Sequence, residues 1–270
     1  MQKEATTLRA VDVLTPRTLD EALRLKAEHA EAVPIQGGTD IMVELNFDRA
    51  RPPVLLNLNE VEELRGWSFA EGRLWLGSGL TYAEAMASPL AEDMPALAEA
   101  ARTVGGPQIR NRGTIGGNLG TSSPAGDALP PLLVCGAEVQ VASVRGERTV
   151  PLQEFLVGVK RNALAADELI LGVCISQKPG RQTFMKVGPR NAMVIAVVSL
   201  ALRVDGELTA AYGSAGPVPG LVRAPLEDAA SFPDQVAAAA SPIDDVRGTA
   251  AYRRHALRVL TQRALERCLA

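Results

Sequence analysis

Two segments that place paired glycines beside threonine and a short polar side chain constrain this chain most strongly. Residues 36–40 read QGGTD, and residues 114–118 read TIGGN. Glycine has no Cβ, so backbone N–H groups can approach an anion closely, and threonine adds a hydroxyl donor. Two such loops can bind a pyrophosphate from two sides. The pair therefore predicts a protein that binds a dinucleotide cofactor.

Neither glycine segment is a standard nucleotide-binding fingerprint. The chain contains no G-x-G-x-x-G and no G-x-x-x-x-G-K-[ST], so a Rossmann fold and a P-loop both lack their signature. Taken alone, residues 37–39 could equally be a plain tight turn. Only the second segment favours the cofactor interpretation over the turn.

Composition excludes several function classes. The 270 residues suit two or three small domains. Only 4% of residues are aromatic, and the net charge is −3, which argues against a nucleic acid as the main partner. Small arginine clusters, at Arg110 and Arg112 and again within residues 253–263, are interpreted as structural or interfacial groups on solvated helix faces.

The cysteines and histidines predict no metal on this chain. Cys135, Cys174 and Cys268 are far apart and form no C-x-x-C pair, which iron–sulfur and structural zinc sites usually contain. We interpret all three as small buried hydrophobic residues in a reducing compartment. The polar start of the chain lacks a signal core, and the longest apolar run, residues 193–204, is too short to span a membrane. We therefore expect a cytoplasmic protein.

Apolar periodicity predicts mixed helices and strands. Thr18 and Glu21 form a predicted capping box, which begins a helix to about residue 31. A long polar segment, residues 105–131, is expected to be an ordered loop, and Asp205-Gly206 a hairpin turn. The final helix, over residues 248–269, is expected to bury Tyr252, Ala256, Leu260 and Ala264 on one face. The remaining expected elements are strands at 8–13, 33–35, 54–58, 74–77, 137–144, 168–175, 184–187, 194–204 and 208–214, helices at 41–45, 81–86 and 94–104, a turn with a short helix at 150–157, and a boundary at 177–182.

The glycine segments belong to a set of motifs that resembles one family from end to end. Residues 108–131, which contain TIGGN and end in SSPAGDALPP, resemble the second FAD-binding motif of the flavin (medium) subunit of molybdenum hydroxylases, the xanthine dehydrogenase and carbon monoxide dehydrogenase family. Residues 36–40 resemble the first motif of that family. Residues 186–190, followed by 195–198, resemble its C-terminal signature, and Tyr252-Arg253-Arg254 fits the start of its last helix.

The resemblance implies an α+β chain in three parts. Two subdomains would form the FAD-binding fold of the vanillyl-alcohol oxidase (PCMH) type, at residues 1–59 and 60–176. A smaller C-terminal α+β domain of antiparallel strands and a terminal helix would follow at residues 177–270. Met193-Val194 departs from the family, which often has an acidic residue there.

The resemblance also implies which residues bind FAD. Both glycine segments would contact the pyrophosphate, and Val104 and Ile170 would line a ring of the cofactor. Lys186 would lie near the flavin, where a cation favours its reduced, anionic form. The full set of expected contacts is Ile35, Gln36, Gly37, Gly38, Thr39, Asp40, Val104, Thr114, Gly116, Gly117, Asn118, Thr121, Gly126, Asp127, Ile170 and Lys186.

Asp127 is expected to differ from the other contacts, because an ionised carboxylate only accepts hydrogen bonds. It suits sugar or ribityl hydroxyls and would repel a phosphate. Two structural alternatives stay open: Asp127 could cap the helix that begins after it, and Lys186 could be an ordinary surface lysine.

The function that the resemblance implies is electron transfer without a catalytic side chain. FAD on this chain would receive electrons from [2Fe–2S] clusters on a small partner subunit, after a molybdopterin site on a large subunit oxidises the substrate. It would pass them to NAD⁺ or another acceptor, in a dimer of heterotrimers closest to bacterial xanthine dehydrogenases. Alternatives are a carbon monoxide dehydrogenase-type or N-heterocycle or aldehyde hydroxylase, a stand-alone FAD-dependent oxidase, and a scaffold that has lost its cofactor.

Overall fold

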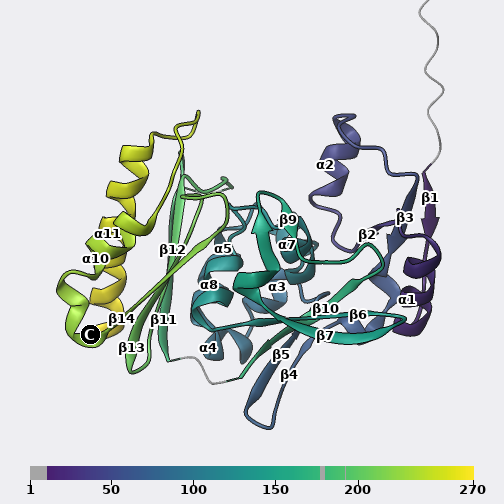
Figure 1. The fold of residues 1–270 in the computed structure, drawn as a ribbon, viewed down its shortest axis with the longest axis horizontal. Helices are drawn as coiled ribbons and strands as arrows, with labels where there is room; N and C mark the ends of the chain where they lie inside the picture. The colour runs from purple at the N-terminus through teal and green to yellow at the C-terminus, as the bar shows by residue number, and fades with distance from the viewer. Residues whose placement is uncertain (1–10, 177–179, 192) are drawn as a thin grey trace, which may run out of the picture.

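The computed structural model describes residues 11–176, 180–191 and 193–270. Three main β-sheets follow one another in chain order along the molecule (Figure 1). Parts of the expected strand at 8–13 and of the expected boundary at 177–182 lie outside the described residues.

The first sheet is a small parallel α/β unit, built from the expected strands at 33–35 and 54–58 and from the described part of the one at 8–13. It has the strand order β1 (Asp12–Leu14), β3 (Val54–Asn57), β2 (Val33–Ile35), and the first connection contains α1 (Leu19–Glu28). The Thr18 hydroxyl caps α1 by accepting from the Glu21 N–H at 3.2 Å. The Glu21 carboxylate accepts from the N–H of Arg17 and not of Thr18, so only half of the predicted capping box forms. The unit also holds α2 (Ile41–Asn46) and the short 3₁₀ turns η1 (Leu58–Glu60) and η2 (Glu62–Leu64).

The second sheet is antiparallel and has the order β4-β5-β10-β6-β7. Two of its strands, β4 and β7, were not predicted, because they are short and nearly all of their residues are exposed. The five strands are β4 (Trp67–Ala70), β5 (Arg73–Gly77), β10 (Leu169–Ile175), β6 (Glu138–Ser143) and β7 (Gly146–Pro151). A two-stranded ribbon, β8 (Leu156–Gly158) and β9 (Arg161–Asn162), and the helix α9 (Leu152–Phe155) follow β7.

The prediction of a loop over residues 105–131 was wrong, because three short helices occupy much of this segment. Buried Ile115 and Leu119 anchor the glycine-rich α7, and the Thr114 hydroxyl caps it. The prolines within α6 and α8 stand in the first turn of each helix, where a missing N–H costs no helical hydrogen bond. The helices of this region are α3 (Tyr82–Ala85), α4 (Leu90–Asp93), α5 (Pro95–Thr103), α6 (Pro107–Arg110), α7 (Ile115–Thr121) and α8 (Leu129–Val134).

The third sheet is an antiparallel meander, β11 to β14. The hairpin at Asp205-Gly206 is confirmed, while β12 begins at Val198 and not at the predicted 194. Strand β14 and helix α10 were not predicted. The elements are β11 (Arg181–Val187), β12 (Val198–Val204), β13 (Glu207–Gly213), β14 (Gly220–Pro225), the 3₁₀ turn η3 (Leu226–Ala230), α10 (Phe232–Ala239) and α11 (Ala250–Leu269).

Helices cover both faces of the third sheet (Figure 1). Helix α11 packs on one face, and α5 and α8 pack on the other, between this sheet and the second one. As a result, Phe184, Ala201 and Ala211 belong to the same apolar core as α5 and α8. The division into three parts after residues 59 and 176 stays a prediction. One apolar core contains residues on both sides of residue 59, and another contains residues on both sides of residue 176, so the cores do not mark these boundaries.

Two side chains of α11 differ from expectation. Ala256, Leu260 and Ala264 are buried as predicted, but Tyr252 is 48% exposed, because it lies in the first turn of the helix beside the Gly248 loop. The next residue, Arg253, is buried instead and donates to the Ser214 carbonyl and to Asp245. The three cysteines are free and buried, as predicted, and burial raises the pKa of the Cys135 thiol to about 12.

The buried Arg253 guanidinium has Asp245 as its counter-charge. Hydrogen bonds from Arg247 and Arg253 hold the pKa of Asp245 far below its usual range. Its stabilisation is therefore complete above the ordinary carboxyl pKa of about 3.9, and it is lost as the pH falls from there through the lowered pKa.

We expect Asp245→Ala to lower the free energy of unfolding by about 3 kcal/mol at neutral pH, because it leaves a buried guanidinium without its counter-charge. Urea denaturation measures the loss. The control is Asp234→Ala, whose partner Arg258 is exposed, and which should cost less than about 1 kcal/mol. Equal losses in the two variants would contradict this role of Asp245.

Candidate cofactor site

The two glycine segments, far apart in sequence, lie in direct contact. A Cβ on Gly37 would come within 2.0 Å of the Arg112 carbonyl oxygen, so only glycine allows this approach. The Arg112 guanidinium donates to the Gln36 carbonyl at 3.1 Å, and the Thr121 hydroxyl donates to Asp40 at 2.7 Å. Residues 36–40 and 112–121 therefore pack against each other.

The first glycine loop presents unbonded backbone donors. Among the described residues, no acceptor is found for the N–H groups of Gly37, Gly38, Thr39 and Asp40, or for the Thr39 hydroxyl. Gly38 has a φ of +73°, a conformation that glycine adopts without strain. The loop can thus direct several donors at an anion.

The backbone N–H groups of Ile115, Gly116 and Gly117 in the second glycine segment are already bonded to other groups of the protein. The N–H groups of Ile115 and Gly116 bind the carbonyls of Leu80 and Ser78, at 2.9 and 2.8 Å. The Gly117 N–H binds the Thr114 hydroxyl at 3.0 Å. Gly116 is required by packing, because a Cβ there would lie 2.5 Å from the Ser78 side chain. The sequence pointed to glycine as a way to reach a phosphate, but here it brings two parts of the chain together.

A buried ion pair joins the glycine-rich segment to the third sheet. Lys186, on β11, donates to Asp127 at 2.5 Å, and both side chains are less than a tenth exposed. Lys186 also donates to the Thr103 carbonyl at 3.2 Å, at the end of α5. Both structural alternatives are therefore wrong: Lys186 is no surface lysine, and the N-cap of α8 is Ala128, without a side-chain cap.

Asp127 and Asn118 each keep an unpaired buried acceptor. Burial raises the pKa of Asp127, and the adjacent Lys186 ammonium partly offsets this rise. The Asp127 Oδ1 and Asn118 Oδ1 atoms are sealed from solvent, and neither has a hydrogen-bond partner among the described residues. A Cβ on Gly126 would lie 2.6 Å from the Asn118 side-chain amide nitrogen. Because Gly126 has no side chain, Asn118 can pack directly against the backbone that precedes Asp127.

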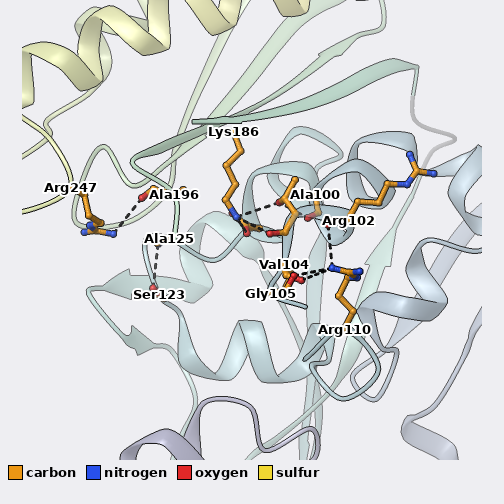
Figure 2. Close-up of polar contacts among 12 residues, drawn as sticks. Ala100, Arg102, Val104, Gly105, Arg110, Ser123, Ala125, Lys186, Ala196 and Arg247 are labelled. Carbon is orange, nitrogen blue, oxygen red and sulfur yellow. Dashed lines mark hydrogen bonds and ion pairs between the residues drawn. The ribbon is translucent and has the colours of Figure 1, made fainter. Parts of the chain in front are cut away.

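The two apolar residues expected to line the cofactor lie beside different helices, Ile170 beside α7 and Val104 at the end of α5. Ile170 is 9% exposed and lies under α7, where a Cβ on Gly120 would be 3.9 Å from its Cδ1. Val104 is half-buried at the C-terminal end of α5. The Arg110 guanidinium holds that end by donating to the carbonyls of Val104 and Gly105, at 3.2 and 2.9 Å (Figure 2).

The structure adds residues that the motifs did not identify. Asn59 donates to the Gln36 carbonyl at 2.9 Å, and Arg112 shares that acceptor. Thr103 completes the surroundings of Lys186. Arg112 lies two residues before TIGGN and within the motif at residues 108–131, so its position was a usable signal for it. Asn59 and Thr103 lie outside both motifs and gave none.

The described residues contain no cluster of three or more histidine, cysteine, aspartate or glutamate side chains that could hold a metal ion. In the same parts of the chain, no helix has the length and apolar character needed to cross a membrane.

Known proteins share this architecture. A family model described as the FAD binding domain in molybdopterin dehydrogenase matches residues 9–177. Two solved structures superpose over 96% of this chain: quinoline 2-oxidoreductase from Pseudomonas putida 86 (TM-score 0.88, 24% identity, 96% of that chain) and carbon monoxide dehydrogenase from Hydrogenophaga pseudoflava (TM-score 0.87, 23% identity, 97% of that chain). The predicted α+β fold is confirmed.

Three curated relatives span most of the chain. The nicotinate dehydrogenase FAD-subunit of Eubacterium barkeri is 36% identical over 72% of this chain and 69% of its own length. The putative xanthine dehydrogenase FAD-binding subunit of Escherichia coli is 29% identical over 94% of both chains. The nicotine 6-hydroxylase medium subunit of Paenarthrobacter nicotinovorans is 30% identical over 96% of this chain and 97% of its own. The motifs, the fold and these relatives agree: the chain belongs to the family of FAD-binding domains of molybdopterin dehydrogenases.

Proposed function

We propose that this chain is the FAD-carrying electron-transfer subunit of a molybdenum hydroxylase that oxidises a purine or a related N-heterocycle. Electrons reach it from [2Fe–2S] clusters on a small partner subunit and leave to NAD⁺ or another acceptor. The observation that carries the proposal is the contact between the two glycine segments, in which the N–H groups of the first loop stay unbonded; the second glycine-rich segment also holds two buried, unpaired acceptors, on Asn118 and Asp127.

The first glycine loop fits the pyrophosphate of FAD. Two phosphates carry about two negative charges, and several converging N–H donors stabilise such a group without clustered cations. Gly37 to Asp40 present such donors. The second segment packs against this loop at Gly37, and the Thr114 hydroxyl lies 3.5 Å from the Gln36 side-chain oxygen.

Asp127 and Asn118 fit the sugar part of the cofactor. Each offers a buried oxygen that can only accept, and ribityl and ribose hydroxyls are donors that would satisfy it. A buried acceptor left unpaired costs about 1–3 kcal/mol. We propose that cofactor hydroxyls complete these two side chains.

Lys186 acts on the cofactor through Asp127. Its ammonium is committed to the carboxylate and to Thr103, so the pair presents little net charge. We infer that Lys186 keeps Asp127 ionised as an acceptor, in place of the direct interaction with the flavin that the family resemblance implied. FAD itself supplies the redox chemistry when bound, and no side chain of this chain has to act as a nucleophile or base. Val104 and Ile170 remain proposed lining residues.

The names of relatives support the partner and substrate class. Nicotinate, xanthine and nicotine, named for three of them, are N-heterocycles, and one relative is named as a medium subunit. A large molybdopterin subunit, a small iron–sulfur subunit, a dimer of such heterotrimers and a cytoplasmic location are the corresponding proposals for this chain.

The test is to purify the complex that contains this chain and to follow flavin absorbance without oxygen. We expect two co-purifying subunits, bleaching of the flavin by xanthine, and recovery on addition of NAD⁺. Bleaching by nicotinate and not by xanthine would identify nicotinate as the substrate. Recovery with another acceptor and not with NAD⁺ would identify that compound as the acceptor. A chain without FAD and without partner subunits would refute the proposal.

Gly37→Ala should weaken FAD binding at least tenfold, which is about 1.4 kcal/mol. The added methyl group meets the Arg112 backbone, so the two glycine segments must move apart. The matched control is Gly120→Ala in α7, where the nearest atom to a new Cβ is 3.9 Å away. Titration of the FAD-free chain with FAD compares them. Equal affinities would contradict the packed-loop arrangement.

Lys186→Met should lower the free energy of unfolding by about 3 kcal/mol at pH 7, because it strands a buried carboxylate. Burial raises the pKa of Asp127, so the folded variant binds a proton more tightly than the unfolded chain and gains stability as the pH falls.

The control for this variant is Asp127→Asn/Lys186→Met, which has no charge to bury. Thermal unfolding from pH 7 down to pH 5 should bring the two melting temperatures closer together. A difference that stays constant with pH would show that lost packing, and not the buried charge, causes the effect.

A further inference from the structure

The segment that carries the first glycine loop has no anchor in an apolar core. None of the six residues of α2 is buried, and Met42, Val43 and Phe47 are 45%, 41% and 68% exposed. A helix this short is not stable by itself in water. Polar contacts must therefore set the position of residues 36–47.

A small number of polar contacts do this. The Gln36 carbonyl accepts from Arg112 and Asn59, the Asp40 carboxylate accepts from Thr121, and Glu44 forms an ion pair with Lys160 at 3.7 Å. The contacts from Arg112, Asn59 and Thr121 fall within the glycine loop, residues 36–40, and the Thr114 hydroxyl lies 3.5 Å from the Gln36 side-chain oxygen. Of these residues, Arg112 also meets the loop with its backbone, across Gly37.

Arg112 sets the distance between the two glycine segments from both directions. Its backbone carbonyl is the wall that Gly37 meets, so the loop cannot come closer. Its guanidinium donates to the Gln36 carbonyl at 3.1 Å, which opposes movement of the loop away from the second segment. Among the described residues, Arg112 makes no other side-chain hydrogen bond.

We propose that Arg112 is a positioning residue for the FAD pyrophosphate, which holds the first glycine loop in its binding arrangement before the cofactor arrives. This inference rests on the proposed function. Without the tie, the FAD-free loop visits other arrangements, and the apparent dissociation constant rises as the competent fraction falls. The loop then has to be ordered by the cofactor itself.

The test uses the full-length chain with FAD removed, and Arg112→Ala and Arg112→Lys as variants. The charge control is Arg102→Ala, an exposed arginine on α5. For Arg112→Ala we expect the dissociation constant for FAD to rise about tenfold, which corresponds to about 1.4 kcal/mol. The melting temperature of the FAD-free chain should match that of the control, because the tie lies outside the core.

Two readouts separate positioning from a direct ionic contact with phosphate. Hydrogen exchange of residues 36–47 in the FAD-free chain should become faster in Arg112→Ala and stay unchanged in Arg102→Ala. The salt dependence of FAD binding should be the same in the wild type and in Arg112→Ala, since no phosphate contact is lost. Arg112→Lys keeps the charge but not the planar guanidinium, and should also bind FAD more weakly than the wild type.

Three outcomes would overturn the inference. Equal FAD affinity in Arg112→Ala and Arg102→Ala would remove any role for Arg112. Full affinity in Arg112→Lys, together with a weaker salt dependence in Arg112→Ala, would make Arg112 a direct phosphate ligand. A wild-type chain that binds no FAD would refute the proposed function as well, and this is seen before any variant is measured.

Discussion

The packing of Gly37 against the Arg112 backbone is the constraint on which the site depends. A side chain at residue 37 would overlap the Arg112 carbonyl, so glycine is what lets two segments from different parts of the chain share one surface. Once they are in contact, Gln36 and Asp40 gain hydrogen-bond partners from the second segment. The donors of the first loop stay free as a consequence, because the contact is made by its other groups.

The second half of the site depends on a buried charge pair. Lys186 comes from the third sheet and Asp127 from the glycine-rich segment, so the pair ties the C-terminal part of the chain to the cofactor site. Two neighbouring contacts act on the same boundary: Glu99 on α5 accepts from Thr183 and from the Phe184 N–H. Strand β11 thus contacts α5 at two points, at Glu99 in the middle of the helix and at Thr103 at its C-terminal end. This explains why the third sheet and the middle helices share one apolar core.

The sequence was most reliable where local chemistry decides the structure. Thr18 begins α1, Asp205-Gly206 makes the hairpin, and Val33 to Ile35 form a strand that ends at the first glycine loop. It failed where packing overrides local preference. Residues 105–131 form three helices despite their glycines, because Ile115 and Leu119 are buried, and Tyr252 is exposed although it follows the apolar periodicity of α11.

The sequence by itself determined the family, the two glycine segments and the identity of Asp127 and Lys186 as unusual polar groups, because these are matters of residue type and order. Only the tertiary structure decided what each group does. It showed that glycine at 37 and 116 allows two segments to pack closely, that Lys186 forms an ion pair with Asp127, and that Arg112 hydrogen-bonds the first loop. The reason is physical: a hydrogen bond or a steric contact between residues far apart in the sequence depends on how the chain folds, and no local pattern records it.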